Sequence, residues 1–476
     1  MTGPSLVLGA LVLALGGCSA PPPEEGSSAD EHSPAARRSP GKARATASSP
    51  TDRFTTAPPQ PVAAPTLRLR SAKAAVLEPV RARPATCAQP PGRADDFRVA
   101  GKAPAWEGLA LDKDDAHAEP IGVEASADGT IWTVHDSSGR GFKPGYLRRW
   151  DGSAWRTFDI PAVPFSGPFA PHSNPHTVQD VAVGPDGRVR VFGSPPYAHK
   201  SSGPALFVHT LDKERWRSEV FPLTATASPV AMDAHGPWVR YGERALRWTG
   251  SVWRSYRFPA ARSGVPSYST PETGSMFQGP NGEMWGVTGS RDDGNGRRVG
   301  LLRWEGTGWR EIGLPRMGDP GRGVLPAGER LVETSLKVND MAVLGADDVW
   351  VVGAAAMLAE TGEDEVVDFR PVALHWDGVA WSCHWGLGPA AKGGNERFNH
   401  IESDGAGGMW LVNDTEELWH LSGGRWTRGR LPGFDGCVGS SVNVTDLVLR
   451  PGTREVYALG THHCGRVDRP ALWRTR

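Results

Sequence analysis

The feature that most constrains the fold is a repeated unit of alternating apolar strands, tight turns and tryptophans. Its clearest copies are VNDMAVLGADDVWVVG…VALHWDGVAW at 338–381 and GVEASADGTIWTVH…YLRRWDGSAWRTFDIP at 122–161. Asp-Gly between two apolar runs predicts a hairpin, because these residues accept positive φ. The turn into the second strand of the unit recurs at Asp128-Gly129, Asp186-Gly187, His235-Gly236, Asn281-Gly282, Asp347-Asp348, Gly407-Gly408 and Thr453-Arg454.

The tryptophan that opens the fourth strand of the unit is missing from the last copy. It stands at Trp155, Trp216, Trp253, Trp309, Trp381 and Trp426, and the last unit ends at 471–476 without it. Trp106…Leu111 has the same register but lacks three preceding strands of its own. Pairing this N-terminal strand into the last unit would close a ring and remove open sheet edges. The sequence therefore predicts an all-β chain: a seven-bladed β-propeller of four-stranded antiparallel blades, closed by residues 103–111.

The repeats resemble the tryptophan-rich DVWxVG…LxHWDGxxW propeller repeats of bacterial secreted and surface proteins, over about residues 103–476. This resemblance implies the fold and leaves the function open, because propellers serve as enzymes, scaffolds and lectins. Residues 126–132 resemble a sialidase Asp-box that is one residue short, which is a fold-stabilising turn and no sign of sialidase chemistry. Streptogramin-lyase-like propellers share the seven-bladed layout, but their catalytic motif finds no match here.

Composition divides the chain sharply. All 19 Trp lie beyond residue 100, and residues 19–86 are rich in Pro, Ser and Ala. Such a segment buries too little apolar surface to offset the entropy of ordering it. We therefore expect a disordered tether over 18–86 and the propeller over 87–476. The formal net charge of −1 favours no nucleic-acid partner.

The N-terminus has the pattern of a lipoprotein signal. An apolar run from Leu6 to Leu15, too short for a membrane span, is followed by Gly16-Gly17-Cys18. The Leu15–Cys18 ending resembles the bacterial lipobox, although no Lys or Arg precedes the run. The resemblance implies a signal peptide over 1–17, lipidation such as palmitate on Cys18, and anchoring to the cell membrane or outer membrane, facing the periplasm or the exterior. A plain secretory signal cut elsewhere is the alternative.

Four further cysteines would then lie in an oxidising compartment, which favours two disulfides with three connectivities open. Cys437 precedes the first strand of the last blade and Cys464 follows its second strand, so the two should share a face. That pairing leaves Cys87 with Cys383, which would fasten the segment before the closing strand. Metal ligation is disfavoured because no pair has Cys-x-x-Cys spacing.

Candidate chemistry lies where the first strand of each blade meets the central channel. Aligning the repeats on their turns places these residues there: Gly122, Asp180, Pro229, Ser275, Asp340, His400 and Asp446. Three interpretations stay open. The aspartates could accept backbone N–H bonds from adjacent blades, the ring could hold Ca²⁺ or another ligand, or His400 could act as a base.

The sequence contains no complete catalytic constellation: it lacks a Gly-x-Ser-x-Gly elbow, a phosphate-binding Gly loop and a His-Glu-x-x-His helix. Long insertions at 289–298 and 354–370 should rise as loops on one face. We therefore expect a monomeric, non-enzymatic envelope lipoprotein that binds a protein or polysaccharide and needs no cofactor. The alternative is a divalent-cation-dependent lyase or hydrolase with its site at the central channel.

Overall fold

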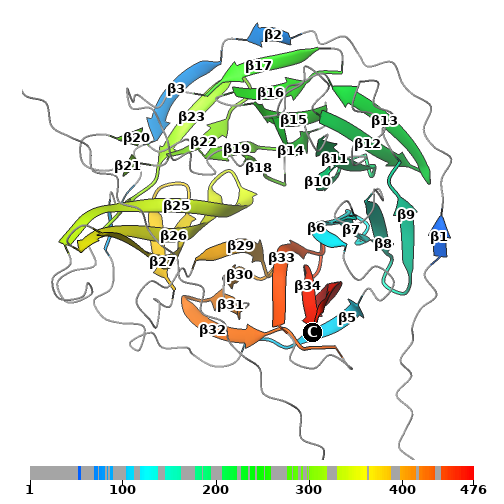
Figure 1. Cartoon of the computed structure of the whole chain (residues 1–476). Coiled ribbons are helices and arrows are strands. Elements are labelled where there is room, and N and C mark those ends of the chain that lie inside the picture. The colour runs from blue at the N-terminus through cyan, green and yellow to red at the C-terminus, as the bar shows by residue number, and fades with distance from the viewer. Residues whose placement is uncertain are drawn as a thin grey trace, which may run out of the picture. The chain divides into compact units, whose positions relative to one another are not determined.

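The computed structural model describes most of residues 103–476, with gaps in the loops, and the short stretches 52–54, 69–72, 74–80, 83 and 86–88. Seven four-stranded antiparallel sheets follow one another around a ring, with their first strands toward the centre (Figure 1). The seven-bladed β-propeller predicted from the repeats is thereby confirmed. Within the described residues, no helix is long and apolar enough to cross a membrane.

The first three blades follow the chain in order, each with neighbouring strands paired. Blade 1 consists of β6 (Glu119–Ala125), β7 (Ile131–Asp136), β8 (Tyr146–Trp150) and β9 (Trp155–Asp159). Blade 2 consists of β10 (Thr177–Val183), β11 (Val189–Ser194), β12 (Leu206–Asp212) and β13 (Arg215–Phe221). Blade 3 consists of β14 (Ala227–Asp233), β15 (Gly236–Tyr241), β16 (Arg244–Trp248) and β17 (Trp253–Arg257).

The remaining blades complete the ring. Blade 4 consists of β18 (Met276–Gln278), β19 (Met284–Val287), β22 (Gly300–Trp304) and β23 (Gly308–Gly313). Blade 5 consists of β25 (Arg330–Gly345), β26 (Asp348–Thr361), β27 (Asp364–Trp376) and β28 (Trp381–Trp385). Blade 6 consists of β29 (Phe398–Ser403), β30 (Met409–Asn413), β31 (Glu417–Ser422) and β32 (Arg425–Arg430). Blade 7 consists of β33 (Ser441–Leu449), β34 (Val456–Cys464), β35 (Val467–Thr475) and β5 (Trp106–Leu111).

The tryptophans of the repeat are architectural. In five blades the second-strand tryptophan lies against an arginine or histidine of the third strand. The pairs are Trp132–Arg149, Trp238–Arg247, Trp285–Arg303, Trp350–His375 and Trp410–His420. In each pair the tryptophan ring fills space between blades. The guanidinium or imidazole of the third-strand residue packs against that ring. This contact explains why Arg-Trp or His-Trp recurs at the ends of third strands.

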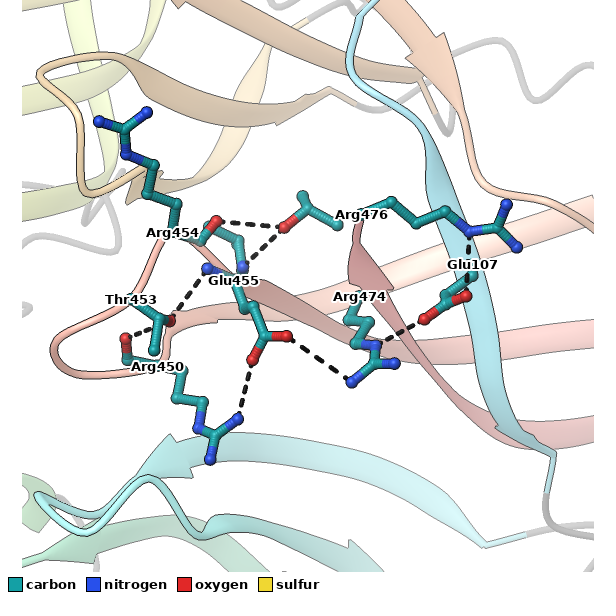
Figure 2. Close-up of polar contacts among 9 residues, drawn as sticks. Glu107, Arg450, Thr453, Arg454, Glu455, Arg474 and Arg476 are labelled. Carbon is teal, nitrogen blue, oxygen red and sulfur yellow. Dashed lines mark hydrogen bonds and ion pairs between the residues drawn. The ribbon is translucent and has the colours of Figure 1, made fainter. Parts of the chain in front are cut away.

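The closing strand β5 completes blade 7 as predicted. It pairs antiparallel with β35, and Thr475 lies opposite Trp106. The carboxylate of Glu107 accepts hydrogen bonds from Arg474 (2.6 Å) and Arg476 (2.9 Å), as Figure 2 shows. Arg474 also lies 3.7 Å from Glu455, which directly precedes β34. Ion pairs therefore join the closing strand β5 to the C-terminal segment across one sheet.

Strand direction gives the ring two different faces. The first-to-second and third-to-fourth strand turns meet on one side, which we call the hairpin face; they are short, as at 126–130 and 151–154. Gly129 (φ 82°) and Gly152 (φ 96°) supply the left-handed backbone that these turns require. The strand ends that flank all other connections, including 160–176 and 258–275, lie on the opposite side, which we call the loop face.

Blade 5 extends beyond its neighbours on the loop face. Its first three strands pair continuously from Arg330↔Glu360 down to Gly345↔Asp348, and β26 turns into β27 at Thr361↔Asp364. The insertion predicted as a loop at 354–370 is therefore regular sheet. The other predicted insertion, 289–298, contains a short hairpin of β20 (Arg291–Asp292) and β21 (Arg297–Arg298). Val366, Val367 and Phe369 in this segment are residue types that favour strands.

Part of the segment predicted as a disordered tether belongs to the ring. β2 (Leu69–Ala72) pairs in parallel with β17, and β3 (Ala75–Val80) pairs in parallel with β23 (Figure 1). Arg83 bridges Ala380 of blade 5, and β4 (Thr86–Cys87) pairs with β24 (Arg316–Met317). We call residues 69–88 the belt. A separate strand, β1 (Asp52–Phe54), pairs in parallel with β9 of blade 1.

Composition alone missed the belt because its stability comes from the blades. β2 and β3 use the unpaired outer edges of finished blades, so main-chain bonds replace the large core that the segment lacks. Pro79 fits within β3 because an outermost strand has one side that needs no N–H donor. The prediction of disorder over 18–86 therefore does not hold for the belt strands. Residues 1–51, including the predicted signal peptide and Cys18, lie outside the described residues.

The disulfide predicted between Cys87 and Cys383 is formed, and it fastens the end of the belt to the outer strand of blade 5. Cys87 is buried in the core cluster between blades 4 and 5. Trp385 donates its indole N–H to the carbonyl of Ala88 (2.9 Å). Cys464 is also disulfide-bonded, but its predicted partner Cys437 lies outside the described residues.

Candidate functional site: the inner ring of the propeller

Most ring residues predicted from the repeats lie at a shared irregularity of the first strands, but in blade 3 Ala231 and not the predicted Pro229 follows the register shift. The pairing register shifts immediately before Asp180, Asp340, His400 and Asp446. A β-bulge re-aims a side chain and frees one backbone position from the ladder. Ser275 directly precedes β18 and lies outside the described residues.

Each aspartate of the ring accepts the N–H of its own successor. Val181 donates to Asp180 (2.8 Å), Met341 to Asp340 (2.7 Å) and Leu447 to Asp446 (2.8 Å). The repetition of this bond shows that the bulge and the aspartate form one structural motif, since the carboxylate satisfies a backbone donor at the bulge.

The second carboxylate oxygen reaches the next blade. Asp340 Oδ2 accepts the N–H of Ile401 (3.0 Å), which joins blade 5 to blade 6. Asp446 Oδ2 accepts the N–H of Val123 (2.9 Å), which joins blade 7 to blade 1. Of the three interpretations of the ring, backbone hydrogen bonding between blades therefore describes these two aspartates directly. We call the two bonds inter-blade staples.

Neighbouring side chains reinforce the junction between blades 5 and 6. Asn339 donates to the carbonyl of Phe398 (3.0 Å) and to Asn399 Oδ1 (3.2 Å). His400 Nδ1 lies 3.8 Å from Asp340 Oδ2, so the histidine stands beside a staple. Burial lowers the pKa of His400 to about 4, so its imidazole side chain is neutral at neutral pH.

Two further carboxyl groups in the inner ring were missed by the repeat alignment. Glu124 and Glu402 follow the ring position by two residues in blades 1 and 6, opposite Trp132 and Trp410 in register. Because side chains two apart in a strand point to the same face, an i+2 search from each ring position would have found them. Glu402 accepts the N–H of Ser403 (2.7 Å).

Burial dominates the electrostatics of these carboxyl groups. Desolvation raises the pKa of Asp180 to about 7, of Asp340 to about 8 and of Glu402 to about 7, with the backbone N–H bonds opposing it. It raises the pKa of Asp446 to about 6. The pKa of Glu124 lies well above its ordinary range, first through burial and then through its carboxyl neighbours. Near neutral pH the ring therefore holds a mixture of protonated and ionised carboxyls.

The arrangement of the described carboxyl groups bears on the Ca²⁺ site considered from the sequence. Among the described residues, no three His, Cys, Asp or Glu side chains come together in a way that could hold a metal ion. The Ca²⁺ site considered from the sequence therefore has no ligand set in this part of the chain. The carboxylate oxygens of Asp340 and Asp446 instead accept backbone N–H groups.

No protein-family model matches the chain, and no curated protein matches it. Solved propellers are similar to it at low identity. A catalytically inactive virginiamycin B lyase from Staphylococcus aureus with quinupristin has 12% identity and a TM-score of 0.47, covering 78% of this chain and 99% of that one. YCF48 from Cyanidioschyzon merolae has 12% identity and a TM-score of 0.43, covering 78% and 98%.

A third neighbour is PorZ from Porphyromonas gingivalis, a bacterial surface component of the type-IX secretion system. It has 16% identity and a TM-score of 0.40, covering 76% of this chain and 46% of that one. These neighbours differ in function from one another. The propeller assignment accordingly rests on the strand pairings of the chain itself.

Proposed function

We propose that the chain is a non-enzymatic cell-envelope lipoprotein whose loop face binds a protein or polysaccharide. The difference between its two faces carries this proposal. The hairpin face consists of short turns that the fold itself requires, whereas the loop face carries every long connection and the extension of blade 5. Segments beyond the needs of the fold are where binding functions concentrate.

The chemistry of the inner ring supports binding over catalysis. Both carboxylate oxygens of Asp340 and of Asp446 accept hydrogen bonds from backbone N–H groups. These side chains are therefore suited to holding blades together. A catalytic acid or base needs access to a substrate proton. His400 lies beside a staple and has no described nucleophile next to it.

The envelope location rests on the lipobox resemblance at Leu15–Cys18. Lipid on Cys18 would anchor the chain through buried methylenes. Replacing Cys18 by Ser should abolish palmitate labelling and move the protein from the membrane to the soluble fraction. Unchanged membrane fractionation of Cys18→Ser would refute the anchor while leaving the binding face untouched.

The binding face can be tested by site-specific photo-crosslinking in the full chain. A crosslinking residue at exposed Lys337, in the extension of blade 5, should capture a defined envelope component. The control position is Val379, which is 77% exposed in a turn of the hairpin face. Equal capture at both positions, or none at 337, would refute the loop face as the binding surface.

A further inference from the structure

The second strand of blade 7 ends with a histidine and a disulfide-bonded cysteine on one face. Side chains two residues apart in a strand point to the same side, so His462 and Cys464 of β34 are neighbours. His462 Nδ1 lies 3.0 Å from Cys464 Sγ, and this sulfur belongs to a disulfide. The imidazole is therefore placed directly at an atom that takes part in redox chemistry.

The surroundings of His462 decide how many protons its ring carries. The residue is fully buried, and its ring packs edge-on against Phe434 and Trp473. Burial, and then the neighbouring His463, lowers the pKa of His462. The imidazole is therefore neutral and has a single N–H group.

That single N–H group points at the sulfur. His462 Nε2 is buried and has no hydrogen-bond partner in the described part of the chain. A proton on Nε2 would leave a buried donor unsatisfied, whereas a proton on Nδ1 has an acceptor in Cys464 Sγ. Buried donors without a partner are rarer in proteins than buried acceptors without one, so Nδ1 carries the proton.

Two described contacts flank Cys437, the partner of Cys464 expected from the sequence. Three residues before Cys437, Phe434 packs against His462 with 5.5 Å between the ring centres. Four residues after it, Ser441 begins β33 and lies opposite His463 in the sheet. The chain on each side of Cys437 is therefore held at the end of β34, which favours the expected pairing.

The disulfide between Cys87 and Cys383 provides a contrast within the same chain. Cys87 is 1% exposed, and among the described residues no N–H group donates to either sulfur of this disulfide. Cys464 is partly exposed and directly precedes an exposed turn at residues 465–466. The chain therefore combines a buried disulfide with one that has a partly exposed cysteine and a hydrogen-bond donor at its sulfur.

Thiol–disulfide exchange depends on which sulfur can leave as the more stable thiolate. A thiolate attacks one sulfur, a new S–S bond forms, and the other sulfur leaves with the electron pair of the old bond. A hydrogen bond from a fixed N–H group stabilises the anion more than it stabilises the neutral disulfide. Attack on the Cys437 sulfur, with departure of Cys464 toward His462, is therefore the favoured route.

We propose that the Cys437–Cys464 disulfide is a site of thiol–disulfide exchange with an external dithiol, in which His462 promotes the departure of the Cys464 thiolate. The first thiolate of the dithiol forms a mixed disulfide with Cys437. The second then attacks the dithiol sulfur of that bond and releases Cys437 as a thiolate. The dithiol is oxidised to a cyclic disulfide, the protein gains two electrons, and the two protons of the dithiol pass through water to the two cysteines.

This site goes beyond the proposed function, because the exchange needs neither a ligand on the loop face nor the lipid anchor. The test uses the full chain, dithiothreitol as the external dithiol and iodoacetamide to trap thiols as they appear, with peptide mapping at successive times. Cys437 and Cys464 should be alkylated together, at least about tenfold faster than Cys87 and Cys383. Release of all four at one rate, or a Cys464 bonded to another cysteine, would overturn the proposal.

A matched pair of variants separates the hydrogen bond from simple exposure. His462→Phe keeps an aromatic ring between Phe434 and Trp473 but cannot donate to the sulfur, and it should slow the release of Cys464 about tenfold. His463→Phe makes the same change on the opposite face of β34 and should alter the rate less than about twofold. Equal rates in His462→Phe and the wild type would mean that His462 has no part in the exchange.

The pKa of the Cys464 thiol gives a second measurement, which does not depend on the rate of reduction. Cys437→Ser releases this thiol, and the pH dependence of its alkylation gives its pKa. Because the thiolate accepts the His462 N–H, adding His462→Phe should raise that pKa. His462→Asn, whose amide can donate from the place of Nδ1, should raise it less. A pKa that is the same with and without His462→Phe would overturn the proposal, even if that variant were less stable.

Discussion

At the inner ends of the blades, half-buried aspartates on one blade accept N–H bonds from the next, as Asp340 does from Ile401. At the outer ends, the blades are held by an added strand, by exposed ion pairs and by a disulfide, Cys87–Cys383. The inner ends crowd carboxyl groups together, whereas the rim places most of its charges in water.

The difference follows from geometry. First strands converge on the axis, where there is room for short polar side chains and backbone but not for another strand. Fourth strands diverge, so their free edges can accept the belt. A closed ring must resist opening at both places, and this chain uses buried hydrogen bonds where it is crowded and covalent or charged contacts where it is open.

The inner and outer ends of the blades should differ most in how their contribution to the free energy of unfolding depends on pH. Because native pKa values of about 6 to 8 at Asp180, Asp340, Glu402 and Asp446 exceed those of unfolded carboxyls, the native state binds more protons between about pH 4 and 8. The free energy of unfolding should therefore fall as pH rises through that range, on the order of 10 kcal/mol between pH 5 and 8. Urea unfolding at the two pH values measures it.

His400 opposes this trend, because its lowered pKa stabilises the native state less as pH falls from about 6.5 to about 4. A single histidine offsets only one of the four carboxyl titrations, so the native state should still be more stable at pH 5 than at pH 8. Glu402→Gln keeps an acceptor for the N–H of Ser403 but removes one titration, so its pH dependence should be weaker. A flat profile between pH 5 and 8 in the wild type would show that the inner carboxyls are not shifted.

The next effect belongs to the rim. Replacing both Cys87 and Cys383 by Ser removes a cross-link across 296 residues of sequence. The unfolded chain gains conformational freedom, and we expect a loss of about 4 kcal/mol. Guanidinium unfolding of the double variant measures it. Reductant is a poorer test, because Cys464 is also disulfide-bonded.

The same double variant tests whether the disulfide holds the belt against the blades. Limited proteolysis should cleave between residues 69 and 88 faster than in the wild type. If the double variant had wild-type stability and wild-type protection of the belt, the rim would owe its closure to strand pairing alone.

Removing a single inter-blade staple should lower the free energy of unfolding somewhat less than removing the disulfide. Asp446→Ala removes the acceptor of the N–H bonds of Val123 and Leu447. Leaving two partly buried donors unsatisfied should cost about 3 kcal/mol in urea unfolding. The matched control is Asp377→Ala, since Asp377 also accepts two N–H bonds, from Val379 and Ala380, but in an exposed turn. Comparable losses in both variants would mean that burial at the axis adds nothing.

The number of blades and the closing strand could be predicted from the sequence because they are local and repeated. Trp106 reveals its strand by matching the register of six other tryptophans. The extension of blade 5 and the belt could not be predicted in this way. Both depend on pairing with edges that exist only after the blades fold, and nothing local in 354–370 or 69–80 marks the partner.

The inner ring was predicted in part for the same reason. Asp180, Asp340 and Asp446 occupy one repeat position, so alignment found them. Glu124 and Glu402 occur in only two blades and carry no repeat signal. Their raised pKa values come first from burial in the ring and then from carboxyl neighbours on other blades, and a single strand shows neither.

The smallest expected effect concerns the ion pairs that close blade 7. Glu107→Gln would remove the charge that pairs with Arg474 and Arg476, whose bonds lower the pKa of Glu107. Because a quarter of the Glu107 side chain is exposed, solvent screens the interaction and the loss should be about 0.5–1 kcal/mol. Added salt should reduce the difference between variant and wild type. A loss as large as that of Asp446→Ala, or one insensitive to salt, would place the rim contacts in the same class as the buried staples.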